Sequence, residues 1–164
     1  MTVMISVWLF LILALLSFLS LYVLTKKMNV IHVIGGYLLS NILLTNTGVI
    51  INLNLKLTWQ DPYSELIFWT QKIPELSLKP ALLLWIIYIL FSGRTVLEKL
   101  VSVFILLTAL VSIEVYFVSI HYLEWVNWNV FYSYLRYIFI LLLMAVYAFY
   151  LEKGMDRNKE VNTI

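Results

Sequence analysis

Long runs of apolar side chains alternate along this chain with short polar segments. A helix needs about 20 mostly apolar residues to cross the roughly 30 Å hydrocarbon core of a bilayer, and there its backbone groups must pair within the helix. The stretches that approach this length are 3–24, 30–53, 78–92, 96–120 and 130–151. The pattern predicts an all-α, polytopic transmembrane bundle of about five spans over 1–152, followed by a cytoplasmic polar tail, 153–164.

The first stretch also has the length of a cleaved signal peptide, but Lys26 and Lys27 follow its apolar run, and no small-residue cleavage site comes after it. This order favours a signal anchor that stays in the membrane. The third stretch, 78–92, is short, so we expect it to be tilted or to be helped by local thinning of the bilayer.

Residues 54–77 carry several charges and two prolines, which are unfavourable in hydrocarbon, so they predict one long outer loop. Within this loop, Asp61 followed by Pro62 is a good start for a helix, and Pro74 stops the apolar run that follows. We therefore expect a short interfacial helix in the loop.

Composition excludes water as the main solvent of this protein. Hydrophobic residues make up 63% of its 164 residues and charged residues only 12%, about half of what soluble domains carry. The formal charge of +2 is too balanced to suggest a nucleic-acid partner, so the expected partner is the lipid bilayer. The absence of cysteine excludes disulfides, thiolate metal sites and a cysteine nucleophile.

Basic residues predict the orientation, because short cytoplasmic loops and helix flanks carry an excess of Lys and Arg. An outside N-terminus puts seven of them in the cytoplasm: Lys26, Lys27, Arg94, Lys99, Lys153, Arg157 and Lys159. It leaves four on the outer side, namely Lys56, Lys72, Lys79 and Arg136. The N-terminus is therefore predicted outside and the C-terminus in the cytoplasm.

Polar residues recur every three or four positions in the second span, which places them on one helix face. The stripe comprises Tyr37, Asn41, Thr45, Gly48 and Asn52. Such groups are unfavourable against lipid, so we expect the stripe to face other helices. One interpretation is interhelical hydrogen bonding with close packing at Gly36 and Ser40. The other is a path for a solute or an ion.

Glu114 and Arg136 are charged residues well inside predicted spans, where an unpaired charge costs about 2.5–3.5 kcal/mol. Both lie at about the same depth below the outer boundary, on helices that are adjacent in sequence. This placement allows an ion pair that sets the register of the two helices. The alternatives are charges that line a functional cavity, or an Arg136 that extends outward alone.

Aromatic residues gather in the segments predicted to lie outside. The candidate outer aromatic contact patch comprises Trp59, Trp69, Trp125, Trp128 and Tyr132. An aromatic belt at the membrane interface explains these residues without further function. The alternative is a docking platform for a ligand or a protein.

No catalytic motif is visible, so no catalytic, cofactor-binding or metal-binding residue is predicted and no cofactor is expected. His32 and His121 fall on opposite sides of the membrane in the predicted topology and cannot share a metal ion.

Glu114 and the segment 126–132 (VNWNVFY) carry a resemblance. The chain resembles a family of small, uncharacterised multi-pass membrane proteins of spore-forming Firmicutes, which share its length, a proline-bearing middle loop and an Asn-Trp-rich loop before the last span. The resemblance implies a bacterial cytoplasmic membrane, and it implies no activity.

Three functional hypotheses follow. The first is a non-enzymatic accessory subunit or self-associating protein, with another membrane protein or itself as partner. The second is a small solute carrier or channel component with a polar cavity open to the outside, built around Asn41, Thr45, Asn52, Glu114 and Arg136. The third, a membrane enzyme, would need several acids or histidines to converge in one cleft. A hydrated pocket that reaches Asn41 or Asn52 would favour the second hypothesis over the first.

Overall fold

The computed structural model describes residues 2–60 and 65–161, with side chains described for 5–59 and 68–154. The helices in chain order are α1 (Thr2–Thr25), α2 (Val30–Val49), the π-helical turn η1 (Ile50–Asn54), α3 (Glu65–Leu76), α4 (Leu78–Phe91), α5 (Val96–Ser119) and α6 (Val130–Val161). Two short strands, β1 (Thr58–Gln60) and β2 (Leu123–Trp125), pair antiparallel.

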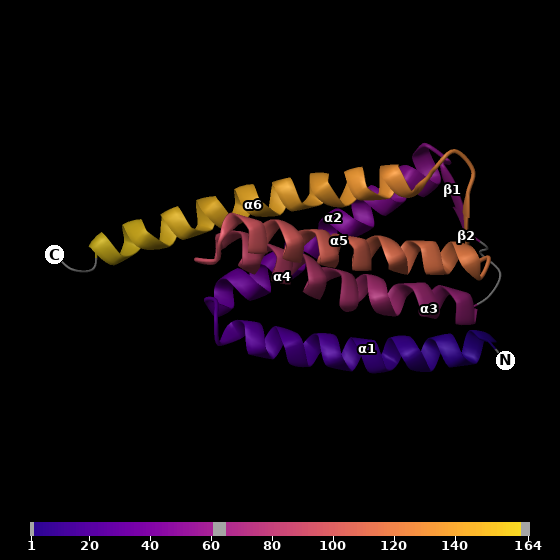
Figure 1. Ribbon diagram of the computed structural model, residues 1–164, viewed down its shortest axis with the longest axis horizontal. Coiled ribbons are helices and arrows are strands. Elements are labelled where there is room, and N and C mark those ends of the chain that lie inside the picture. Colours follow the sequence, from indigo (N-terminus) through magenta and orange to yellow (C-terminus); the bar gives the residue numbers. More distant parts are fainter. Residues whose placement is uncertain (1, 61–64, 162–164) are drawn as a thin grey trace.

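The helices lie side by side along the long axis of the molecule (Figure 1). Five helical stretches are long and apolar enough to cross a membrane: Ile5–Thr25, Val30–Asn54, Phe68–Phe91, Val96–Ser119 and Val130–Gly154. The predicted all-α bundle of about five spans is therefore confirmed, and the chain is an integral membrane protein.

The third span differs from the prediction, because it begins at Phe68 and not near residue 78. The predicted helix of the 54–77 loop exists as α3, but it packs along α1 and runs directly into α4, so its placement flat in the interface is corrected. Two side chains that suggested a loop neutralise each other, since Lys72 Nζ lies 2.7 Å from Glu75 Oε2. Pro74 is accommodated inside the helix and is fully buried. The proposed helix start at Asp61 and Pro62 lies outside the described residues.

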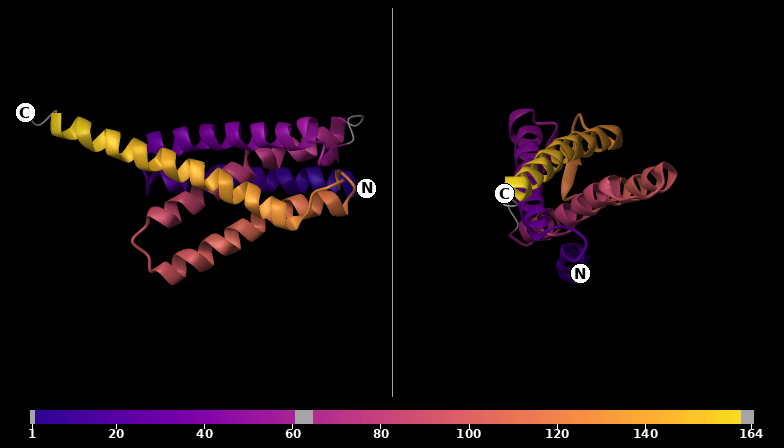
Figure 2. Two further views of the ribbon diagram at one scale, coloured as in Figure 1. Left: turned by 90° about the horizontal axis from the view of Figure 1, so that it is seen from above. Right: turned by 90° about the vertical axis from the view of Figure 1, so that its left-hand side faces the viewer.

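Helix α4 is the centre of the bundle, in contact with α1, α2, α3, α5 and α6. Its apolar residues point in all directions, as expected of a helix that is surrounded by others. Leu83, Leu84 and Ile86 are almost completely buried there and form the main core with Leu44 of α2 and Ile140 of α6. At the end of the molecule opposite the sheet, the α4–α5 hairpin leans away from α6 (Figure 2).

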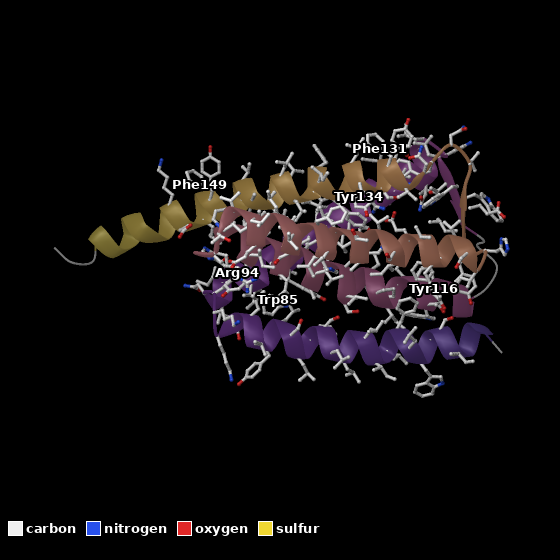
Figure 3. The ribbon with its side chains drawn as sticks, viewed as in Figure 1. Trp85, Arg94, Tyr116, Phe131, Tyr134 and Phe149 are labelled. Atoms are coloured by element: carbon white, nitrogen blue, oxygen red, sulfur yellow. The ribbon has the colours of Figure 1, made fainter. Side chains whose placement is uncertain are left out.

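The two ends of the bundle differ in structure. One end carries the N-terminus, the β1–β2 sheet and the beginning of α6, and we call it the sheet end (Figure 1). The opposite end carries the α1–α2 and α4–α5 turns. Figure 3 shows Arg94 at this opposite end and Tyr116 towards the sheet end. Helix α6 continues through the predicted polar tail as far as Val161.

Many large apolar side chains lie on the outer surface. Leu15 and Leu19 of α1 are more than 60% exposed, and Phe131 and Phe149 point away from the bundle along α6 (Figure 3). Water would penalise such a surface, whereas lipid tails do not. Exposure of this kind is expected on an integral membrane protein.

Candidate functional site

A cluster of charged side chains is buried towards the sheet end of the bundle. Glu114 of α5 accepts a hydrogen bond from Arg136 Nη1 at 3.1 Å and another from the Tyr137 hydroxyl at 2.6 Å, both on Oε1. Lys79 Nζ of α4 lies 3.7 Å from the same oxygen. The side chains of Glu114, Lys79 and Arg136 are only 5%, 10% and 12% exposed. One carboxylate thus joins three helices.

Arg136 also ties the cluster to α2. Its Nε donates to the Thr47 hydroxyl at 3.0 Å, and its Nη2 donates to the carbonyl oxygen of Leu44 at 2.9 Å. Gly48 of α2 lies beside the guanidinium, since a Cβ there would be in ordinary contact with Nη2 of Arg136, at 3.6 Å. The guanidinium is held on three sides, which makes Arg136 a fixed part of the cluster and leaves little freedom to extend outward alone.

A cavity of about 60 Å³, partly open at the surface, lies against this cluster. Its lining comes from every helix except α1 and from both strands, and comprises Gly48, Ile51, Asn52, Thr58, Gln71, Glu75, Lys79, Glu114, Phe117, Leu123, Trp125, Trp128 and Arg136. We call it the outer cavity. Such a hollow lined by convergent charged and amide groups is the usual form of a small-ligand site.

The π-helical turn η1 and the sheet build the rim of the outer cavity. A π-helical turn alters the direction of side chains at the end of a helix and is frequent at functional sites. Here Asn52 accepts a hydrogen bond from the hydroxyl of Thr58, the first residue of β1. Thr58 is paired with Trp125 of β2, and Trp128 Nε1 donates to the Ser133 hydroxyl at 2.8 Å. Segments distant in sequence therefore meet over the charged cluster.

The residues of the polar stripe in the second span lie in different environments, some in the lining of the outer cavity and others away from it. Asn52 lines the outer cavity with Gly48, as described. Asn41 is half-buried and donates to the Tyr37 carbonyl at 2.9 Å, well away from the cavity lining. Thr45 is exposed on the bundle surface, so the expectation that it faces other helices is wrong. Thr47, outside the predicted stripe, is the residue that contacts Arg136.

The aromatic patch is divided in a similar way. Trp59 and Trp69 are more than half exposed, and Tyr132 is also exposed, as expected of an interfacial belt. Trp125 and Trp128 are half-buried and line the outer cavity. The five residues do not form one continuous outer surface.

Several residues of the charged cluster and the outer cavity did not stand out in the sequence, chiefly Glu75, Lys79 and Tyr137. A signal was present, because Lys72, Glu75 and Lys79 are spaced by three and four residues and so share one helix face. Pro74 suggested a loop at this point and hid the periodicity. Tyr137 carried no separate signal among the many aromatic residues of its span.

The charged and hydrogen-bonding groups of the cluster could hold a small polar ligand. Among the described residues, no group of three or more His, Cys, Asp or Glu side chains could hold a metal ion. Glu114 is engaged by Arg136 and Tyr137, and Lys79 forms a longer ion pair with it, of 3.7 Å. Because an ammonium group has three N–H donors, Lys79 keeps donors that can face the cavity.

Fold and site together define the class: an integral membrane protein with five helices that could cross the bilayer and a buried charged cavity near one end. No protein-family model matches the chain, and no match is found among curated proteins or solved structures. The site itself is therefore the basis for a proposal about function.

Proposed function

We propose that this chain is a non-enzymatic membrane protein that binds a small anionic solute in the outer cavity, as a small solute carrier or channel component. The observation that carries the proposal is Lys79, a buried ammonium group that lines the cavity and forms only a long ion pair, of 3.7 Å, with Glu114. An ionisable group at membrane depth is costly, and such groups commonly mark a ligand or ion site.

Charge in and around the cavity favours an anion. Among the described side chains that line the outer cavity, Lys79 and Arg136 balance Glu75 and Glu114. Lys72 lies beside the cavity and pairs with Glu75, so the group as a whole carries one positive charge in excess. Because the surroundings are largely apolar, this charge is screened less than it would be in water. An anion would neutralise the excess and accept hydrogen bonds from the Lys79 ammonium.

The size of the cavity limits the solute. About 60 Å³ corresponds to roughly four to six water molecules at about 10–15 Å³ of such space each. A carboxylate or a phosphate group fits this space, whereas a nucleotide does not. Gln71, Asn52 and Thr58 offer further polar groups around the rim.

The exposed apolar surface gives no independent support to an accessory or self-associating role. Leu97 and Leu100 of α5 are among its most exposed residues. Contact with lipid accounts for them as well as a protein partner does. If no solute binds, the accessory or self-associating role remains. In that case Glu114 and Arg136 serve only to hold the helices together.

The location we propose is the bacterial cytoplasmic membrane, with the N-terminus and the outer cavity outside and the C-terminus in the cytoplasm. Burial of Lys79 and Arg136, together with the pairing of the half-buried Lys72 with Glu75, removes three of the four basic residues that opposed this orientation. Among the residues with described side chains, the exposed cation at the sheet end is Lys56, whereas the opposite end carries Lys26, Lys27, Arg94, Lys99 and Lys153. This asymmetry follows the positive-inside rule.

Orientation is tested with single cysteines, since the natural chain has none. In intact cells we expect a membrane-impermeant maleimide to modify Lys56→Cys and to leave Lys153→Cys unmodified until the cells are permeabilised. Both side chains are exposed, so access to the reagent depends on the side of the membrane alone. Modification of Lys153→Cys but not of Lys56→Cys in intact cells would reverse the proposed orientation.

Anion binding is tested by thermal unfolding of the purified protein in detergent at constant ionic strength. We expect phosphate, formate or acetate to raise the melting temperature relative to gluconate, which is too bulky for the cavity. A ligand that binds only the folded state stabilises it in proportion to the logarithm of its concentration over Kd. Lys79→Met should weaken binding by about 10- to 100-fold, the usual effect of a lost hydrogen bond to a charged group.

The matched control is Lys56→Met, which removes an exposed charge at the same end of the protein and should leave binding unchanged. Lys79→Met should still fold, because Glu114 keeps its ion pair with Arg136. Equal stabilisation by gluconate and by the small anions, or equal binding by Lys79→Met and the natural protein, would contradict the proposal.

A further inference from the structure

A second cavity, of about 330 Å³, opens at the end of the bundle opposite the sheet, and we call it the inner cavity. Its lining comprises Lys27, Met28, Asn29, His32, Ile87, Tyr88, Phe91, Ser92, Ala148 and Glu152. The polar atom that points to a role is Nε2 of His32, which is buried and has no hydrogen-bond partner among the described residues. Buried polar atoms are nearly always paired, so an unpaired one calls for an explanation.

The inner cavity continues towards the centre of the membrane as a narrow crevice. The crevice shares Met28, His32, Ile87 and Ala148 with the cavity and extends to Gly36, Leu84, Met144 and Tyr147. It therefore passes between α2, α4 and α6. The same three helices contribute Gly48, Lys79 and Arg136 to the outer cavity. The two hollows thus share walls from the same three helices, one towards each end of the bundle.

The separation between the two hollows is short and apolar. Along α4, Lys79 of the outer cavity and Leu84 of the crevice are five residues apart, which is about 8 Å of helix rise. Along α6, Arg136 and Met144 are about 12 Å apart. Leu83 and Ile140, which are completely buried, lie at the intervening positions.

Glycines bring the helices together at this constriction. A Cβ at Gly36 would lie 2.6 Å from Cδ2 of Leu84, so α2 and α4 touch there through a glycine and the end of one leucine side chain. A Cβ at Gly35 would collide with the hydroxyl of Tyr147 on α6. The crevice is therefore narrowed by the side chains of Leu84 and Tyr147, which lie against bare glycine backbone.

We infer that α2, α4 and α6 enclose a translocation path that connects the outer and inner cavities and is closed in this structure between Lys79 and Leu84, where Leu83 and Ile140 fill the space. The inference rests on the proposed function, since the anion held at Lys79 would be the solute that crosses. Movement of these apolar side chains would join the crevice to the outer cavity. His32 and Lys27 then offer hydrogen-bond donors at the far end of the path.

The test is one-sided labelling of Leu84→Cys in the otherwise cysteine-free full chain, reconstituted in sealed vesicles. A membrane-impermeant methanethiosulfonate is applied to one side at a time. We expect Leu84→Cys to be modified from either side, because the path opens to each. The matched control is Ile86→Cys, which lies on the same helix two residues away, is completely buried and lines neither cavity nor the crevice. It should be modified from neither side.

A second variant tests the constriction itself. Adding Gly36→Ala to Met144→Cys, which keeps the Leu84 side chain that the new methyl group would meet, should slow modification from the sheet end by about tenfold, which corresponds to roughly 1.4 kcal/mol. Anion binding should be unchanged in Gly36→Ala, because residue 36 is about 18 Å of helix rise from Gly48. Met144→Cys, which also lines the crevice, serves if Leu84→Cys does not fold.

Modification of the crevice cysteine from only one side, or equal modification of Ile86→Cys, would overturn the path. Labelling requires no ligand, so its outcome is independent of the melting experiment. Anion binding without two-sided labelling would leave a binding protein with no path, whereas two-sided labelling without anion binding would refute the proposed solute alone.

Discussion

The Glu114→Gln variant is expected to lose about 3–5 kcal/mol of its free energy of unfolding, the usual cost of removing one partner from a buried ion pair. Glu114 is the one carboxylate that Arg136, Tyr137 and Lys79 all approach. Neutralising it leaves two cations in a largely apolar environment, where the nearby carboxylate, Glu75, is already paired with Lys72. We expect this to be the most destabilising of the conservative substitutions considered for this protein, as measured by reversible unfolding in mixed micelles.

A double variant tests whether the loss in Glu114→Gln comes from leaving the charge of Arg136 unpaired. Adding Arg136→Gln to Glu114→Gln should recover about 1–3 kcal/mol, because coupled residues in contact show interaction energies of that order. Glu124→Gln, which changes an exposed carboxylate on β2, is the control and should be close to neutral. Additive losses in the double variant would show that Glu114 and Arg136 act separately, despite the 3.1 Å contact between them.

The Gly35→Ala variant is expected to lose about 1–3 kcal/mol, the usual cost of overfilling a packed interior. The added methyl group would meet the hydroxyl of Tyr147, so either the ring or α6 must shift. Apolar attraction in water does not hold membrane helices together, so their association depends on close contacts of this kind. The measurement is the same unfolding free energy in mixed micelles.

Two further variants identify the cause. Tyr147→Phe removes the atom that the new methyl group would meet, so it should restore much of the stability when combined with Gly35→Ala. Gly93→Ala adds a methyl group where nothing lies within 4 Å, and it should be neutral or slightly stabilising. A loss in Gly93→Ala equal to that in Gly35→Ala would mean that the contact with Tyr147 is not responsible.

The charged cluster is not explained well by a contribution to stability alone. Replacing a buried ion pair as a whole by apolar side chains is often neutral or stabilising, so such a pair is weak support for a purely structural role. The surplus cation Lys79 strengthens this reasoning, because a register lock between Glu114 and Arg136 does not need it. The proposed binding of an anion would account for its presence.

Prediction from sequence was most successful for the number and approximate limits of the spans. Each span must close its own backbone hydrogen bonds in hydrocarbon, so its length and apolar content are local properties of the sequence. The third span was the exception. Its beginning contains Lys72, Pro74 and Glu75, and only the contact with α1 and the pairing of Lys72 with Glu75 make a helix of this segment inside the bundle.

The candidate site was predicted in part. The cost of a charge in lipid drew attention to Glu114 and Arg136, and the periodicity of the second span drew attention to Asn52. Thr45 was included because it shares that periodicity, but the bundle does not cover the face on which it lies. Periodicity identifies a helix face, and it does not tell how far along that face the neighbouring helices extend.

The sequence by itself determined that this protein has lipid as its solvent and that its spans are helical. It also determined which residues carry charge into the spans. Each of these properties depends on the transfer of local segments from water to hydrocarbon. The tertiary structure alone decided which charges meet. Lys79, Glu114 and Arg136 lie up to 57 positions apart in the sequence, and they become neighbours only where α4, α5 and α6 come together. The strands that close the outer cavity are likewise distant in sequence, so their contribution follows from packing and not from any local pattern.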